Sequence, residues 1–215
     1  MQKTEANYRY VKNPKEFCIL AEEVLLKLNG IVSVDTEFLR MYSFYPILSI
    51  IQLNHPDIDC PIILDIKKLA TCKDATHNLK RVISHLFLND DVTMLLHAPY
   101  QDIEAIYYLT KKLKMRNNIN KLTENIFDTQ TAVQFLGYEG NVSHERMLSE
   151  LLGVDLPKDS PDYLTWLKRP LSSHHLEYAA NDVLFLRQCF EKLKQDLTSQ
   201  NKWGYFLAES EEISN

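Results

Sequence analysis

The spacing of apolar residues along this chain predicts alternating strands and helices. Strands are expected at residues 7–11, 31–34, 46–54, 62–66, 92–96 and 126–128. Helices are expected at residues 14–28, 74–88, 101–113, 129–136, 143–152 and 176–197. Short links between the second, third and fourth strands favour an antiparallel meander. These elements predict one α/β domain over residues 1–215, with a mixed sheet, helices on its faces and a frayed acidic tail at 208–215.

Two acidic residues, Asp35 and Glu37, come directly after the apolar strand at 31–34. Because side chains alternate along a strand, both leave the same face, roughly 6–7 Å apart along the backbone. Two carboxylates at the end of a core strand are costly unless a cation or a proton lies between them. This setting indicates half of a divalent-metal site, and a solvated strand end is the alternative.

Further acids lie at two other junctions in the chain. Asp102 falls in the first turn of a predicted helix, where capping alone explains an acid, but it also follows the carboxyl end of a core strand. Tyr178 and Asp182 are four residues apart on a helix, so they share one face about 6 Å apart. The alanines at 179 and 180 are expected to let this helix approach the sheet closely. An ionised Asp on such an apolar face is hard to bury unless it is paired or bound to metal.

Composition narrows the class of protein. A hydrophobic content of 45% and a charged content of 25% are ordinary for a soluble globular domain. The net charge of −5 argues against a protein that holds nucleic acid by bulk electrostatics, but not against an enzyme whose bound metals supply positive charge. Four scattered cysteines are typical of reduced thiols in the cytoplasm. No signal peptide, membrane span or membrane contact is expected.

The four acids and the tyrosine together resemble the DEDDy class of 3′–5′ exonucleases, and specifically ribonuclease D. Matching segments occur in the family's order at 35–40, 45–46, 51–53, 97–104, 127–138, 150–154, 166–171 and 177–183. The likeness extends from about residue 10 to residue 205. It implies an RNase H-like fold.

The resemblance implies a metal-dependent 3′–5′ exoribonuclease that trims RNA 3′ ends, such as those of tRNA precursors, and releases nucleoside 5′-monophosphates. Two divalent cations, Mg²⁺ or Mn²⁺, are expected roughly 3.5–4 Å apart, clamping the attacking and leaving oxygens. Asp35 is expected to bridge them, with Glu37 and Asp182 completing one site and Asp102 holding the second ion through water. Tyr178 is expected to orient the attacking water. A 3′–5′ exonuclease acting on single-stranded DNA, or a catalytically silent nucleic-acid-binding relative, is the alternative.

The sequence indicates the residues that contact substrate less clearly than it indicates the metal-binding acids. Phe38 and Gln52 are candidates to meet the terminal base or sugar, and packing is the alternative for both. In the loop before the tryptophan, Thr165 replaces the family's usual acid and an Arg is missing, which leaves Lys158 as the candidate to hold substrate. The chain is expected to be a catalytic domain without the C-terminal HRDC module that ribonuclease D often carries.

Other polar residues are expected to have structural roles. His97 is expected to be a hydrogen-bonded histidine at a strand end, and Asp128 to cap the following helix; a metal role is the alternative for each. His144 and Glu145 are expected on the surface. The basic run at 111–116 is either a solvated helix end or a contact for phosphate.

Overall fold

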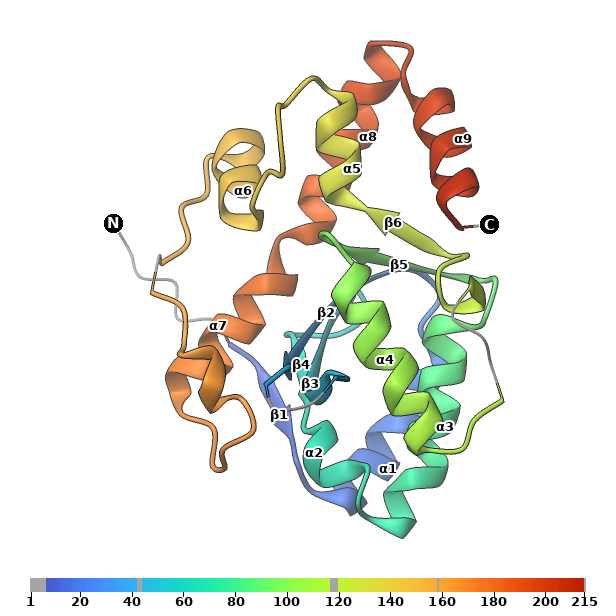
Figure 1. Ribbon diagram of the computed structural model, residues 1–215, viewed down its shortest axis with the longest axis vertical. Coiled ribbons are helices and arrows are strands. Elements are labelled where there is room, and N and C mark those ends of the chain that lie inside the picture. Colours follow the sequence, from blue (N-terminus) through green and yellow to red (C-terminus); the bar gives the residue numbers. More distant parts are fainter. Residues whose placement is uncertain (1–6, 42–43, 117–119, 158, 215) are drawn as a thin grey trace.

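The computed structural model describes residues 7–41, 44–116, 120–157 and 159–214. Within these ranges a six-stranded sheet forms the centre of the molecule (Figure 1). Its strands, in the spatial order β1-β4-β3-β2-β5-β6, are β1 (Arg9–Val11), β2 (Gly30–Leu39), β3 (Ile47–Asn54), β4 (Ile62–Leu64), β5 (Val92–Leu96) and β6 (Ile126–Asp128). The pairs β2–β3 and β3–β4 are antiparallel, and the other pairs are parallel. The mixed sheet and its meander are therefore confirmed.

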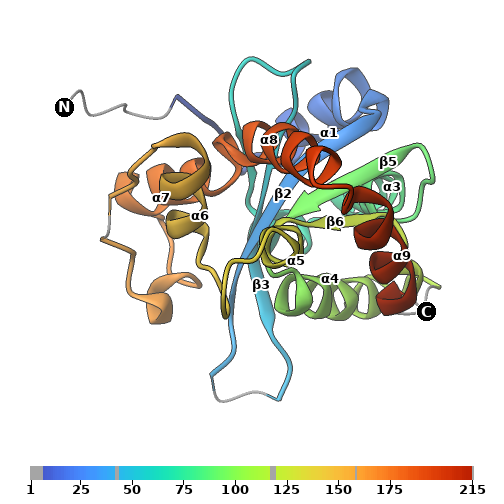
Figure 2. The same ribbon diagram turned by 90° about the horizontal axis from the view of Figure 1, so that it is seen from above.

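Helices cover both faces of this sheet. They are α1 (Pro14–Glu23), α2 (Ile66–Leu69), α3 (Lys73–Phe87), α4 (Tyr100–Lys112), α5 (Thr129–Phe135), α6 (His144–Leu152), α7 (Ser173–Leu184), α8 (Leu186–Ser199) and α9 (Trp203–Ser214). One core joins α1, α3 and α4 to buried residues of β2, including Val32 and Val34. Another joins α7 to Ile50 and Ile63. Figure 2 accordingly shows α7 on one side of β2 and β3, and α4 on the other.

The main differences from the predicted helices lie in three places. The helix predicted at 176–197 is divided at Phe185 into α7 and α8. At that break the Asn54 side-chain amide donates to the carbonyl oxygens of Val183 and Leu184, at 3.5 and 3.4 Å. These carbonyls therefore accept hydrogen bonds from a residue of β3 at the point where the helix is interrupted. α1 ends at Glu23 and a 3₁₀ turn follows. The tail predicted to fray from residue 208 is instead helical through Ser214.

The site is positioned by a difference in strand length. β2 pairs with β3 as far as Leu39, but it pairs with β5 only between Gly30 and Ser33. Beyond Ser33, the edge of β2 is therefore not covered by β5, and the chain leaving β5 turns into α4 beside it. This opening lies at the carboxyl ends of two parallel strands, the usual place for ligands in α/β sheets. None of the helices in the described part of the chain is long and apolar enough to cross a bilayer.

Candidate active site

Asp35 and Glu37 lie inside β2, because the strand continues past the apolar run to Leu39. Their side chains leave the sheet on the face that α7 covers, while the alternate residue, Thr36, is buried on the other side. Strand periodicity thus places both carboxylates on one face, as expected from the sequence.

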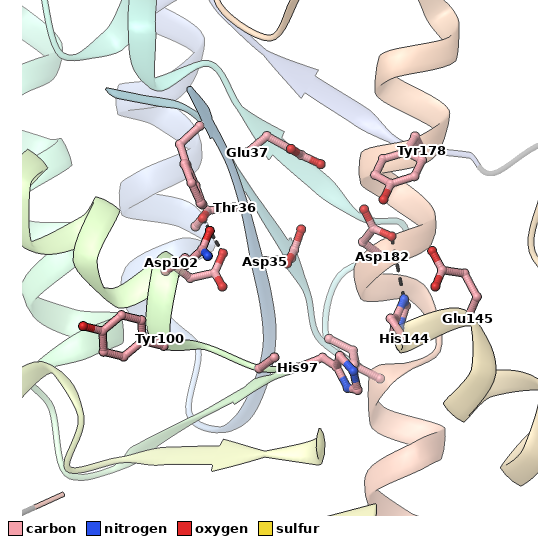
Figure 3. A pocket seen from close by; sticks show the side chains of 14 residues that line it. Asp35, Thr36, Glu37, His97, Tyr100, Asp102, His144, Glu145, Tyr178 and Asp182 are labelled. Atoms are coloured by element: carbon pink, nitrogen blue, oxygen red, sulfur yellow. Dashed lines mark hydrogen bonds and ion pairs between the residues drawn. The ribbon is translucent and has the colours of Figure 1, made fainter. Parts of the chain in front are cut away.

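The helix α7 brings the partner groups. Ser172 caps it by accepting a hydrogen bond from the His175 backbone amide, and the buried Ala179 and Ala180 pack in one cluster with strand residues. These small side chains let α7 lie close to the sheet. One carboxylate oxygen each from Asp35, Glu37 and Asp182 then lie within 4.8 Å of one another (Figure 3). Such a group of hard oxygen ligands fits a divalent cation.

Asp102 approaches from the opposite side of Asp35 (Figure 3). It lies in the first turn of α4, is 8% exposed, and accepts a hydrogen bond from the Thr36 hydroxyl. It is not among the three carboxylates that converge within 4.8 Å. It lines the same cavity, on the other side of Asp35 from Glu37 and Asp182 (Figure 3).

A cavity of about 490 Å³ opens over these groups. All five predicted catalytic side chains line it, which brings together residues from β2, α4 and α7: Asp35, Glu37, Asp102, Tyr178 and Asp182. Phe38 also lines it. The sequence predicted this set from positions up to 147 residues apart.

The other two substrate predictions, Gln52 and Lys158, have different outcomes. Gln52 is fully buried and is not part of the cavity wall. Its amide nitrogen instead donates to Asp35 Oδ2 at 3.1 Å from the neighbouring strand β3, so packing beside Asp35 replaces the predicted contact with substrate. Lys158 lies outside the described residues.

Burial and mutual repulsion raise the pKa values of the acids. Burial is the largest cause for Asp35 and Glu37, whose pKa values rise well above the ordinary range, and the charges of neighbouring carboxylates add to it. Burial also raises the pKa of Asp102 to about 6, against the opposing hydrogen bond from Thr36. The pKa of Asp182 is raised by burial and lowered in part by His144. Negative charge at this site is therefore unfavourable without a compensating cation.

His144 was wrongly expected on the surface, whereas Glu145 is exposed as expected. His144 and Glu145, at the start of α6, both line the cavity. His144 Nδ1 lies 3.7 Å from Asp182 Oδ1, and its Nε2 is buried with no hydrogen-bond partner among the described residues. The cap at Ser143 signalled a helix start. Nothing in the spacing along the chain showed that this start would face α7.

His97 and Asp128 have the structural roles expected for them. The ring nitrogens of His97 lie 2.9 Å from the Thr129 hydroxyl and 2.8 Å from the Val142 carbonyl. Asp128 caps α5 by accepting from the Gln130 backbone amide, and also accepts from the amide of Ala98. Asp128 does not line the first cavity.

Comparison with known proteins agrees with this arrangement. A family profile described as 3′–5′ exonuclease matches residues 8–198. A protein from Nitrobacter hamburgensis named ribonuclease D is 30% identical over 185 residues, which are 86% of this chain and 44% of that protein. The chain thus spans less than half the length of this curated relative.

Solved structures show the same fold. RNase D from Escherichia coli superposes with a TM-score of 0.75 at 25% identity, covering 97% of this chain and 50% of that one. The catalytic core of RRP6 from Trypanosoma brucei has the same TM-score of 0.75 at 23% identity, covering 100% of this chain and 53% of that one. The second similarity is one of fold alone.

Proposed function

The chain belongs to the 3′–5′ exonuclease family, and from this premise we propose that it is a hydrolase that removes nucleotides from RNA 3′ ends and releases nucleoside 5′-monophosphates. One observation carries the proposal. The carboxylates of Asp35, Glu37 and Asp182, drawn from a strand and a distant helix, meet within 4.8 Å on the wall of an open cavity. A set of acids with raised pKa values is unfavourable as packing but suits cation binding.

The position of each acid in the cavity indicates which cation it would bind. Asp35 lies between the Glu37–Asp182 side and the Asp102 side of the cavity (Figure 3), so it is the ligand that two cations, Mg²⁺ or Mn²⁺, would share. Glu37 and Asp182 would complete one position, and Asp102 would hold the other through water. When bound, the cations would offset phosphate charge and lower the pKa of the attacking water.

Tyr178 has the properties of a hydrogen-bonding group rather than a base. Burial raises its pKa far above the ordinary value, and the charges of Asp182, Glu37 and Asp35 raise it further. The phenol therefore keeps its proton at neutral pH, and its hydroxyl, on the face of α7 that carries Asp182, would orient the attacking water. Phe38, on the cavity wall, would meet the terminal base or sugar.

We propose RNA as the substrate because structures similar to this chain are described as acting on RNA or binding it. The E. coli RNase D structure is described as an exoribonuclease involved in structured RNA processing, and a structure of RNase D from T. brucei holds RNA. We extend this to structured RNA 3′ ends such as those of tRNA precursors. The acids do not distinguish ribose from deoxyribose, so single-stranded DNA is the competing substrate. A cytoplasmic location is proposed from the four free cysteines of the chain.

The test is turnover of a labelled oligonucleotide, RNA beside DNA, with Mg²⁺, Mn²⁺ or EDTA. Stepwise release of 5′-monophosphates from the 3′ end of RNA is expected with either cation and none in EDTA. Asp35→Ala is expected to lower the rate roughly 10³-fold or more, since several kcal/mol of charge stabilisation are lost. Asp57→Ala, an aspartate whose side chain is 77% exposed, is the matched control.

Each result has a defined meaning. An Asp35→Ala protein with a native circular dichroism spectrum and wild-type turnover would refute the assignment. Faster cleavage of DNA than of RNA would replace the substrate but keep the chemistry. Binding without turnover under every cation condition would favour the silent relative.

A further inference from the structure

Two enclosed polar atoms beside the candidate active site have no hydrogen-bond partner. In the described part of the chain, the buried side-chain atoms without a partner are Oε1 of Gln52 and Nε2 of His144. Leaving a buried acceptor unpaired costs free energy, so a polar side chain in such a place requires an explanation. An apolar side chain of similar size would avoid this cost. Both residues therefore indicate a role other than packing.

Gln52 faces Asp35 across two paired strands. It lies on β3 directly opposite Asp35 of β2, and the side chains of such cross-strand partners lie on one face of the sheet. Its Nε2 donates to Asp35 Oδ2 at 3.1 Å, and the residue is fully buried. Gln52 does not line the cavity, so the group that it contacts is the carboxylate rather than a ligand.

His144 faces Asp182 from another direction. α6 begins at this residue, and Ser143 caps the helix by accepting from the Arg146 backbone amide. The Nδ1 atom of His144 lies 3.7 Å from Asp182 Oδ1, and its side chain is 13% exposed (Figure 3). A proton on Nδ1 is favoured because this nitrogen faces a carboxylate, which leaves Nε2 as the acceptor. The unpaired atom of His144 is thus an acceptor, as it is in Gln52.

The two side chains share one arrangement. Each turns its donor toward one oxygen of an acid and keeps its acceptor enclosed without a partner among the described residues. The acids that they contact, Asp35 and Asp182, belong to the three carboxylates whose oxygens meet within 4.8 Å. A carboxylate held by one oxygen cannot turn freely, and its second oxygen stays available to a cation. Carboxylates that bind metals are usually oriented by hydrogen bonds of this kind.

We propose that Gln52 and His144 are positioning residues for the cation site. Each orients the carboxylate that it contacts, so that Asp35 and Asp182 are ready to bind a divalent cation. The inference rests on the proposed function, because the cation is the one that the hydrolase would use. Removing either side chain should weaken cation binding without destabilising the cation-free fold. A residue with a purely structural role would show the opposite.

The test is calorimetric titration of Mn²⁺ alone into protein freed of metal with EDTA. His144→Leu and Gln52→Met keep most of the side-chain volume and remove the donor. Each is expected to raise the Kd for Mn²⁺ roughly 10-fold. His144→Asn keeps an amide donor near the place of Nδ1 and should restore most of the wild-type affinity. In EDTA, the midpoint of thermal unfolding of each variant should rise or stay within about 2 °C of wild type.

The matched controls are His174→Leu and Gln188→Met, because both residues are exposed and neither lines the cavity. Wild-type Kd values are expected for both. The inference is overturned for a residue whose variant binds Mn²⁺ as wild type does, or whose variant lowers the midpoint in EDTA by more than about 2 °C. For His144 it is also overturned if the Asn variant loses as much affinity as the Leu variant.

Binding and turnover separate this inference from the proposed function. A wild type that binds Mn²⁺ but cleaves no RNA would refute the proposed function, and the Kd values would still decide the roles of Gln52 and His144. Unchanged Kd values in an active enzyme would overturn the positioning roles and leave the proposed function in place. A wild type that binds no Mn²⁺ would overturn the inference.

Discussion

In the described part of the chain, two side-chain clusters hold buried carboxylates, one of them around Asp65 and the other around Asp35, and other side chains compensate the charge only in the first. Asp65, 0% exposed between β4 and α2, receives two hydrogen bonds of 2.8 Å from Arg169 and another from the Tyr10 hydroxyl. The second cluster, around Asp35, places several carboxylates together. They receive hydrogen bonds from Gln52 and Thr36 and lie near His144, but they have no lysine or arginine partner in the described part of the chain. Each cluster has a tyrosine, but only the first has an arginine within it.

The pKa values of the two clusters move in opposite directions. Burial acts to raise the pKa of Asp65, but the hydrogen bonds from Arg169 and Tyr10 outweigh it and the pKa is lowered. Burial and neighbouring charges raise the pKa values of Asp35 and Glu37. The Asp65 cluster is complete, in that its negative charge has a cationic partner, and it stabilises the fold. The Asp35 cluster is incomplete, and the free energy that its repelling charges cost would be recovered by binding an external cation. This difference separates a structural charge from a functional one.

The largest expected effect comes from breaking the complete cluster. Arg169→Met leaves Asp65 buried without its cation, and the free energy of unfolding should fall by about 3–5 kcal/mol in urea denaturation. Arg81→Met is the matched control, because Arg81 pairs with Glu22 on the surface and exposed pairs contribute about 1 kcal/mol or less. A loss at Arg169 no greater than that at Arg81 would contradict the comparison.

Neutralising the incomplete cluster should do the reverse. In EDTA at pH 8, Asp35→Asn is expected to raise the free energy of unfolding by about 1–3 kcal/mol, because it removes one of several repelling charges. The same change at Asp65, Asp65→Asn, should lower it. Mg²⁺ at constant ionic strength should stabilise wild type more than Asp35→Asn, since a cation ligand is missing in the variant.

The gain from Asp35→Asn should depend on pH. A carboxyl whose folded pKa is raised holds a proton that the unfolded chain has released, so wild type loses stability as pH rises from the unfolded value near 4 through the folded value. For Asp102 that folded pKa is about 6. The wild-type and Asp35→Asn curves should therefore converge near pH 4 and separate progressively as pH rises above it. Parallel curves from pH 4 to pH 8 would show that the cluster carries no such penalty.

The smallest expected effect compares the two tyrosines. Tyr10→Phe removes a hydrogen bond to the Asp65 carboxylate and should cost about 1.5 kcal/mol of stability, with turnover on RNA retained. Tyr178→Phe should leave the free energy of unfolding nearly unchanged but slow turnover roughly 10²-fold. Thermal unfolding and initial rates on both variants decide this. If both changes act on stability alone, the division between the clusters is wrong.

The elements that carry the acids could be predicted from the chain, because local patterns determine them. Alternation along β2 placed Asp35 and Glu37 on one face, and the four-residue spacing on α7 placed Tyr178 with Asp182. The division of the last long helix at Phe185 could not be predicted, because Asn54 of another strand satisfies the carbonyls at the break.

His144 and Gln52 show where reasoning from the sequence ends. Both are polar residues of ordinary spacing, and one was expected on the surface and the other at the substrate. Packing of α6 against α7 brought His144 to Asp182, and the pairing of β3 with β2 placed Gln52 beside Asp35. Contacts between distant segments decided both roles.

The sequence by itself indicated the candidate catalytic residues and the elements that hold them, because strand and helix periodicities act over a few residues. Only the tertiary structure decided that the acids meet and that an arginine compensates Asp65 but not Asp35. These depend on the short pairing of β5 with β2 and on the packing of α7, which no local pattern encodes.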